Sequence, residues 1–296
     1  MTTIEAFDRL MDRVGAGERL GSDDLAQLAA TSDILQLGML ADTVRRALHG
    51  SQVTYLRVAL CAFDEPLSEH VSPAAREVRL TGNPESLDVA ITSVETARAV
   101  AGDRSVSAFS WLDVERIAGG PPSKALARLR LAGLDALAEV PLDRIGDPAM
   151  AVDALASTGY QRLRLTIEKA PADARTALFV RAAEMQDRFA CIQAIDALPL
   201  RLDALRPTTG YNDVKSVAIA RLAAPNIQSI QVDWLRYGPK LAQVALTFGA
   251  DDVDNVTASD DAPEGRRRAP LEEVRRNIEA AGLEPAERDG RFTVVA

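Results

Sequence analysis

Apolar and polar residues near the N-terminus alternate at the spacing of amphipathic helices. In Ile34–Leu48 the apolar residues form one stripe, Asp33 stands before the segment as a capping residue, and Gly50 follows it. Two shorter segments, Ile4–Val14 and Asp24–Ala30, have the same character. The pattern therefore predicts three helices before residue 51.

From Val53 onward, short apolar runs alternate with helical segments. The runs are Val53–Leu60, Leu87–Ser93, Ser105–Phe109, Ala136–Val140, Arg162–Ile167, Phe189–Ile195 and Ile227–Trp234. The helical segments are Glu95–Ala101, Leu112–Ile117, Pro122–Ala132, Pro148–Ser157, Ala172–Gln186, Asp213–Ala223 and Pro239–Phe248. Strands that are apolar on both faces and alternate with helices indicate parallel βαβ units.

This alternation favours an α/β fold, a (β/α) barrel of TIM-like or partial-barrel type. The alternative is a doubly wound sheet, but the first turn, Cys61–Pro66, lacks the glycine-rich phosphate loop of that fold. Asp251–Arg268 is strongly charged and is expected to be a solvated loop. Pro270 leads a helix over Leu271–Ala281, and Phe292–Val295 is expected to be a closing strand. We expect a helical extension (1–50), a barrel (51–257) and a C-terminal loop, helix and strand (258–296).

The composition of the chain limits the classes of partner and the cellular location that we expect. The net charge of −9 disfavours nucleic acid and an anionic membrane surface, since both attract a basic excess. The N-terminus lacks the basic and apolar regions of a signal peptide, and no apolar run reaches the ~18 residues of a membrane span. With two distant cysteines, Cys61 and Cys191, a cytoplasmic protein without disulfides is expected.

The C-terminal third carries a family resemblance. The stretches Thr209–Leu222, Asn226–Trp234, Gly238–Asp254 and Leu271–Asp289 resemble the radical S-adenosylmethionine (SAM) enzymes of the futalosine pathway of menaquinone synthesis, aminofutalosine synthase and cyclic dehypoxanthine futalosine synthase. Weaker matches, such as Gly17–Leu20 and Ala41–Arg46, extend the resemblance to the N-terminus. The resemblance implies the same barrel fold.

The chain departs from this family where the family performs its radical chemistry. The family holds a [4Fe–4S] cluster with three cysteines, C-x-x-x-C-x-x-C, after the first strand. Here that loop contains Cys61 alone. Thr92–Glu95 stands where the family has a glycine-rich turn for the methionyl part of SAM, and Glu139–Leu142 stands at its acidic position after the fourth strand. The sequence therefore predicts no [4Fe–4S] cluster and no other cofactor, and it leaves SAM open as a ligand.

Polar residues at predicted strand ends are the candidates for a ligand site, because barrels bind ligands at the carboxyl ends of their strands. The alternative is that they cap helices or form a solvated rim. Cys61 is the one residual candidate for a metal ligand or nucleophile, against the alternative of a buried core residue. Arg57 and Lys240 are expected to balance the acidic groups. The ligand candidates are Glu139, Glu168, Asp196, Asp233, Trp234, Lys240, Gln243, Asp251, Asp252 and Asp254.

Two classes of function stay open. The first is a pseudoenzyme of the family that binds a small molecule, or that partners a cluster-bearing homologue or a second copy of itself. The second is a cluster-independent lyase or transferase that acts on a nucleoside-like or aromatic carboxylate substrate at the barrel mouth. In both, neither nucleic acid nor a membrane is a partner.

Overall fold

Eight parallel strands form a nearly closed barrel, which confirms the predicted fold class. The computed structural model describes residues 3–67, 71–201, 208–262 and 268–295. The barrel strands are β1 (Gln52–Ala62), β2 (Glu77–Thr81), β3 (Ser105–Ser110), β4 (Ala136–Glu139), β5 (Leu163–Ile167), β6 (Ile192–Pro199), β7 (Ser229–Asp233) and β8 (Asp252–Thr257).

The strands follow one another around the barrel in sequence order, and β8 pairs with β1. The barrel is completed between β4 and β5 by two backbone hydrogen bonds. The Leu142 amide donates to the Thr166 carbonyl at 2.9 Å, and the Thr166 amide donates to the Val140 carbonyl at 3.0 Å. The carboxyl ends of all eight strands therefore meet at one mouth of the barrel.

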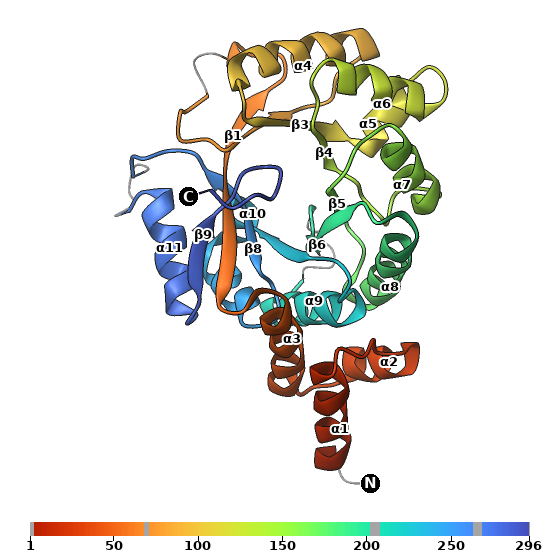
Figure 1. Ribbon diagram of the computed structural model, residues 1–296, viewed down its shortest axis with the longest axis vertical. Coiled ribbons are helices and arrows are strands. Elements are labelled where there is room, and N and C mark those ends of the chain that lie inside the picture. The colour runs from red at the N-terminus through yellow and green to blue at the C-terminus, as the bar shows by residue number, and fades with distance from the viewer. Residues whose placement is uncertain (1–2, 68–70, 202–207, 263–267, 296) are drawn as a thin grey trace.

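Helices surround the barrel and cover the outer faces of its strands (Figure 1). Ser86, Ser110, Asp147, Thr209 and Asp233 each cap a helix with the side chain. The helices are α4 (Leu87–Ala101), α5 (Trp111–Ile117), α6 (Pro122–Leu131), α7 (Pro148–Ser157), α8 (Ala172–Phe189), α9 (Gly210–Ala223), α10 (Trp234–Leu246) and α11 (Pro270–Ala280). No helix in the described ranges is both long enough and apolar enough to cross a membrane.

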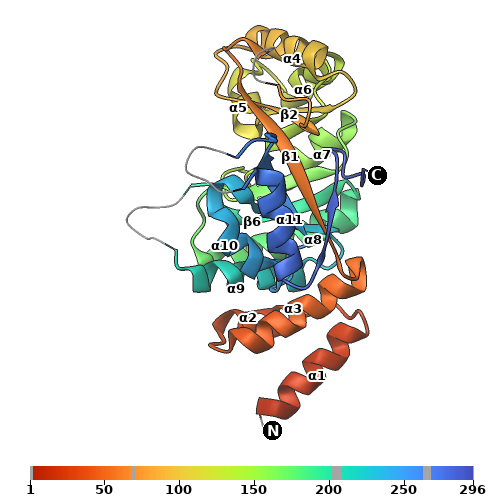
Figure 2. The same cartoon turned by 90° about the vertical axis from the view of Figure 1, so that its left-hand side faces the viewer.

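Three N-terminal helices lie at one side of the barrel, outside its ring of helices, with α2 and α3 beneath α9 (Figure 2). They are α1 (Thr3–Gly15), α2 (Ser22–Ala30) and α3 (Ile34–His49), which match the three expected helices. Lys215 Nζ of α9 donates to the Thr31 carbonyl at 2.6 Å, and the Tyr211 hydroxyl donates to the Ser32 carbonyl at 3.0 Å. The division of the chain at residues 50 and 257 stays a prediction.

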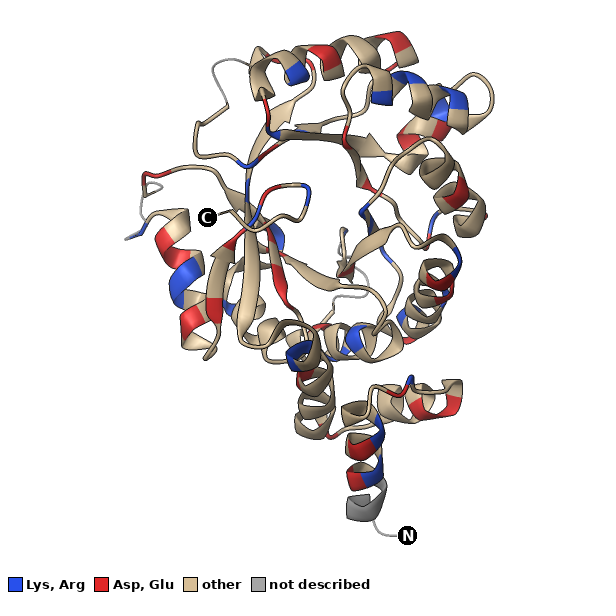
Figure 3. Cartoon of the chain, viewed as in Figure 1, with Lys and Arg blue, Asp and Glu red and all other residues tan. Residues whose placement is uncertain are grey.

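Two strand assignments from the sequence were wrong. Leu87–Ser93 belongs to α4, because Ser86 caps a helix there, and the second strand is Glu77–Thr81. The expected solvated loop contains β8, since Asp252–Thr257 is a buried strand except at its end. The two strands that the sequence missed, β2 and β8, alternate charged and apolar residues. Their charged side chains point into the barrel, where Arg79 of β2 binds Asp254 of β8. Charged residues occur on barrel strands as well as on the surrounding helices (Figure 3).

The C-terminal segment covers the amino ends of the strands. A ninth strand, β9 (Glu284–Glu287), pairs in parallel with the first residues of β1, and the segment that follows lies across the barrel opening in Figure 1. Gly290 lies against Glu77 and Ser105, the first residues of β2 and β3. The expected strand at Phe292–Val295 was wrong, because there Val294 makes only a single bridge to Arg288. This mouth is therefore covered, and the carboxyl-end mouth is the open one.

Candidate functional site

A cavity of about 380 Å³ opens at the carboxyl ends of the strands. This is the end at which (β/α) barrels bind their ligands, because the βα loops gather there. Every barrel strand, or the residue directly after it, contributes to the wall. One or two lining residues per strand are Leu60 from β1, Arg79 and Thr81 from β2, Ser110 from β3, Glu139 from β4, Arg164 and Thr166 from β5, Asp196 from β6, Asp233 from β7, and Asp254 and Asn255 from β8.

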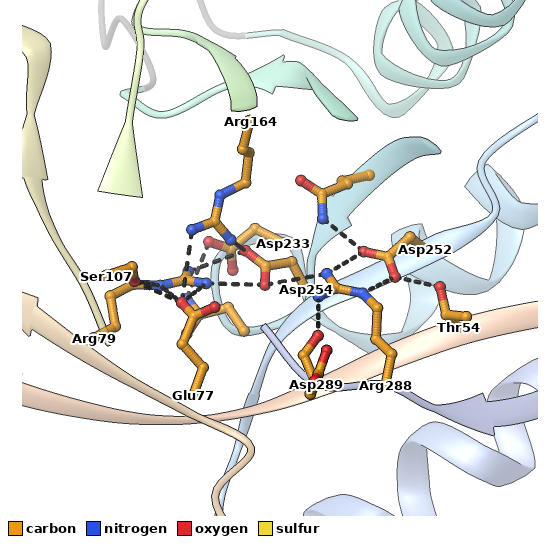
Figure 4. Close-up of polar contacts among 12 residues, drawn as sticks. Thr54, Glu77, Arg79, Ser107, Arg164, Asp233, Asp252, Asp254, Arg288 and Asp289 are labelled. Atoms are coloured by element: carbon orange, nitrogen blue, oxygen red, sulfur yellow. Dashed lines mark hydrogen bonds and ion pairs between the residues drawn. The ribbon is translucent and has the colours of Figure 1, made fainter. Parts of the chain in front are cut away.

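A buried ion network forms the floor of this cavity (Figure 4). Asp254 accepts hydrogen bonds from Arg79 Nη1 and Nη2 at 3.0 and 3.1 Å and from Arg164 Nη1 at 2.8 Å. Burial alone would raise the pKa of Asp254, but the two guanidinium groups hold it well below its usual value. Asp254 is therefore ionised and fixed between two arginines.

Glu77 lies on the other side of Arg79. Its Oε1 accepts from Arg79 Nε at 2.8 Å and from the Ser107 hydroxyl at 2.6 Å, and it lies 3.6 Å from Arg164 Nη2. Two carboxylates and two guanidinium groups thus neutralise one another inside the barrel. Charged groups out of water are stable only when they are paired in this way.

The network continues to the C-terminal segment through Arg288. Its Nε and Nη2 donate to the two carboxylate oxygens of Asp252 at 2.6 and 2.7 Å, and Nη2 lies 3.9 Å from Asp254 Oδ1. The Asp252 carboxylate also accepts from Gln231 Nε2 at 2.6 Å. Charged contacts therefore run without a break from the covered end of the barrel to the cavity floor.

Acidic groups on neighbouring strands line another part of the wall. Burial, together with the nearby Asp233 carboxylate, raises the pKa of Asp196 to about 8. Burial also raises the pKa of Glu139. The Asp233 carboxylate, by contrast, has two hydrogen-bond donors. It caps α10 by accepting from the Arg236 amide at 2.8 Å, and it accepts from Asn255 Nδ2 at 3.1 Å.

Two buried polar atoms on β5 have no hydrogen-bond partner among the described residues. They are Thr166 Oγ1 and Arg164 Nε, and both residues line the cavity. A buried hydroxyl or N–H without a partner costs about 1–3 kcal/mol, so such atoms are usually satisfied by water or a ligand. The wall of the cavity therefore presents unused hydrogen-bonding capacity.

The structure brings four of the predicted ligand residues together. Glu139, Asp196, Asp233 and Asp254 all line the cavity, although they come from four different strands. Glu168 lies just outside, where its carboxylate is 3.0 Å from Arg144 Nε and 3.6 Å from Arg201 Nε. Whether these residues bind a ligand stays a prediction.

The other candidates lie elsewhere. Asp251 directly precedes β8 and Asp252 is its first residue, so both lie at the covered end. Asp251 pairs with Arg221 and lies 3.3 Å from His49 Nε2. The expected convergence of Asp251 and Asp252 at the open mouth was therefore wrong. Trp234 is buried in α10, Lys240 is exposed, and neither they nor Gln243 line the cavity.

The prediction that Arg57 and Lys240 balance the acidic groups of the cavity was also wrong. Arg57 pairs with Glu287 at 2.6 Å and with Asp260 at 3.1 Å, away from the cavity. Arg79 and Arg164 fill that role, and neither was singled out from the sequence. The available signal was the alternation of charged and apolar residues in Glu77–Thr81, which is typical of a strand with one polar face.

The cysteines do not fit a [4Fe–4S] cluster, which needs three thiolates in one place. Cys61 is packed in the hydrophobic core near the carboxyl end of β1, and burial raises the pKa of its thiol. Cys191 precedes β6 at the opposite end of the barrel, where its carbonyl accepts the Leu163 amide at 2.7 Å. These two are the only cysteines of the sequence.

The turn after the second strand also differs from the sequence-based assignment. Thr92–Glu95 lies inside α4, and the true turn is Gly82-Asn83, both residues of which line the cavity. Gly82 has a φ of +103°, and an added Cβ would lie 2.6 Å from the Phe63 ring. One glycine therefore stands in this turn, and the ring of Phe63 packs directly against it.

Comparisons with known proteins agree with the resemblance in the sequence. A family model described as the CofH/MqnC C-terminal region matches residues 191–295. Aminodeoxyfutalosine synthase of Thermus thermophilus is 25% identical over 97% of this chain and 95% of its own length. A 5-amino-6-(D-ribitylamino)uracil–L-tyrosine 4-hydroxyphenyl transferase of Archaeoglobus fulgidus is 38% identical, but over only 30% of this chain and 27% of its own length.

Solved structures share the fold. Methylornithine synthase has a TM-score of 0.70 at 18% identity, with 96% of this chain and 98% of that chain covered. The FeFe-hydrogenase maturase HydG from Carboxydothermus hydrogenoformans has a TM-score of 0.71 at 13% identity, with 95% of this chain and 79% of that chain covered. The residues matched by the family model, 191–295, include the part of the chain in which the sequence resemblance is strongest.

Proposed function

The chain is related to the radical SAM-type enzymes of the futalosine pathway, and from this relationship we propose that it is a non-radical member that binds a small polar molecule. The observation that carries the proposal is the cavity at the carboxyl ends of the strands, which has a fixed ionic floor and unpartnered polar atoms in its wall. A barrel that had lost its ligand would be expected to fill this space with large side chains.

The available cysteine donors support the proposed loss of radical chemistry. A site-differentiated [4Fe–4S] cluster needs three protein thiolates, and the sequence contains two cysteines at opposite ends of the barrel. Cys61 is also a poor ligand as it stands, because burial raises its pKa and so disfavours the thiolate. No step of the proposed function passes through a cluster.

A cluster-independent enzyme is the second candidate, and one observation favours it. Asp196 has a pKa of about 8 and lines the same cavity as the ionised Asp254. A carboxyl group that titrates near neutral pH can act as a general acid or base. Partnership with a cluster-bearing homologue, the other role that the sequence leaves open, has no comparable support among the described residues.

The test combines two measurements on the full chain. Anaerobic reconstitution with iron and sulfide is expected to leave no broad visible absorbance from a [4Fe–4S] cluster. A screen of small nucleosides, aromatic carboxylates, amines and SAM by thermal shift is expected to raise the melting temperature for some compounds, because ligands that bind only the native state stabilise it. Stoichiometric cluster formation, or the absence of any binding, would contradict the proposal.

A further inference from the structure

The charged groups of the cavity are not evenly matched, and the imbalance indicates what kind of ligand group it takes. Four arginines line the cavity, and each has a carboxylate within 4.0 Å. Arg79 and Arg164 are neutralised by Asp254 and Glu77. Arg236 lies 3.8 Å from Asp233, and Arg201 lies 3.6 Å from Glu168. Among the described residues, no cationic side chain lies within 4.0 Å of the carboxylates of Glu139 or Asp196, although both line the cavity. The unmatched groups of the wall are therefore acids.

These acids come from the two strands that flank β5, the strand with the unpartnered hydroxyl. Glu139 is the last residue of β4, Thr166 is the penultimate residue of β5, and Asp196 lies within β6. The three side chains thus line the cavity from three strands that follow one another around the barrel. Thr166 is 2% exposed, and within the described ranges its Oγ1 has no hydrogen-bond partner and the Asp196 carboxylate accepts only the Leu198 amide, at 3.3 Å.

We infer that Thr166 and Asp196, with Glu139 beside them, form a subsite for a protonated amine of the ligand. The inference rests on the proposed function and specifies the ligand of that site. An alkylammonium group has three N–H donors and no acceptor, so a hydroxyl oxygen and two carboxylates match it. The apolar residues Leu60, Phe109, Leu200 and Leu235, which also line the cavity, suit an apolar or aromatic body attached to the amine.

The protonation of Asp196 supports this assignment and makes it measurable. In the free protein Asp196 has a pKa of about 8, so it is mostly protonated at pH 7. The groups whose charges act on it are Asp233 from β7, Arg236 from α10 and Asp254 from β8. Burial, followed by the charge of Asp196, raises the pKa of the Tyr237 hydroxyl. A bound ammonium lowers the pKa of a neighbouring carboxyl, so binding releases a proton from Asp196.

The experiment uses three ligands of matched size and shape. Benzylamine, benzyl alcohol and benzoate are titrated into the full-length protein at pH 7 by calorimetry, in phosphate and in HEPES. Benzylamine is expected to bind at least about tenfold more tightly than the other two, because charge-assisted hydrogen bonds are stronger than those between neutral groups. Its apparent enthalpy is expected to differ between the two buffers, which reports proton release.

Three variants locate the subsite. Asp196→Asn is expected to weaken benzylamine binding about tenfold and to abolish proton release. Thr166→Val, which has nearly the same shape, is expected to weaken binding several-fold without lowering the melting temperature, because it removes a buried hydroxyl that has no partner. Asp260→Asn, an exposed carboxylate that does not line the cavity, is the control and is expected to leave binding unchanged.

The outcomes separate this inference from the proposed function. Equal binding of benzyl alcohol, tighter binding of benzoate, or unchanged binding by the Asp196→Asn protein would overturn the amine subsite and leave the cavity as a ligand site of other chemistry. Absence of binding by all three compounds would also overturn the subsite. The proposed function itself fails only if the wider screen finds no ligand or a cluster assembles.

Discussion

Arg79 and Asp254 are joined across the barrel interior by two hydrogen bonds of 3.0 and 3.1 Å, although their strands are separated by β1. Arg164 binds the same carboxylate from β5, so one aspartate connects strands on different sides of the barrel. A buried carboxylate that neutralises two guanidinium groups stabilises the fold and also fixes the cavity floor.

Replacement of this carboxylate is expected to be costly. Asp254→Asn keeps the volume but leaves Arg79 and Arg164 without their shared negative partner, so the free energy of unfolding should fall by about 3–5 kcal/mol. Urea denaturation followed by circular dichroism measures this change. Asp260→Asn, at an exposed carboxylate, is the matched control and should change stability by less than about 0.5 kcal/mol. A loss of under about 1 kcal/mol for Asp254→Asn would show that the network is not the stabilising element described here.

Much of the fold follows from the sequence, because alternating apolar runs and helical segments require parallel strands covered by helices. The strand β2 was not predicted by this pattern. Glu77 and Arg79 interrupt its apolar pattern, and Arg79 is neutralised by Asp254, which lies 175 positions away. A partner so distant in sequence is visible only once the barrel is closed.

The sequence predicts that acidic residues at strand ends form the candidate site, but it does not settle which carboxylates of the segment 251–254 face the cavity. Glu139 and Asp233 are recognisable as the last residues of β4 and β7, because the end of an apolar run marks the end of a strand. Asp196 follows the apolar run Phe189–Ile195 in the same way, although β6 continues to Pro199. The acidic segment 251–254 was ambiguous, since a strand beginning one residue earlier or later would send different carboxylates to the open mouth. In the structure Asp254 reaches the cavity, whereas Asp252 binds Arg288.

The two thiols are expected to be unreactive in the native protein. Cys61 and Cys191 are 3% and 7% exposed, and burial raises the pKa of both thiols, so little thiolate is present at pH 8. Titration with Ellman's reagent should detect less than one thiol in the native state and both in guanidinium chloride. Rapid reaction of the native protein, abolished by Cys61→Ser, would instead support Cys61 as a reactive or metal-binding residue.

The cover at the amino ends of the strands depends on Gly290. An added Cβ at this position would overlap Ser105 Oγ and Glu77 Oε2, and both atoms belong to buried side chains. Gly290→Ala should therefore displace the C-terminal segment and lower the free energy of unfolding by about 1–3 kcal/mol. Gly120→Ala is the control, because a Cβ there meets nothing within 4 Å. Limited proteolysis from the C-terminus reports the displacement directly, and equal protection of both variants would contradict the expected overlap.

The raised pKa of Asp196 predicts a specific dependence of stability on pH. Its pKa is about 8 in the folded protein against 3.8 as the ordinary value, so between these values the folded state holds a proton that the unfolded state has lost. The stabilisation from this group is complete below about pH 4 and is lost as the pH rises through about 8. Asp196→Asn removes the titrating group and is nearly isosteric. The stability of the wild type should therefore fall relative to that of the variant by up to about 1.4 kcal/mol per pH unit between pH 5 and 8. Urea denaturation of both proteins across this range measures the difference, and two parallel stability curves would mean that Asp196 is ionised in the folded protein at neutral pH.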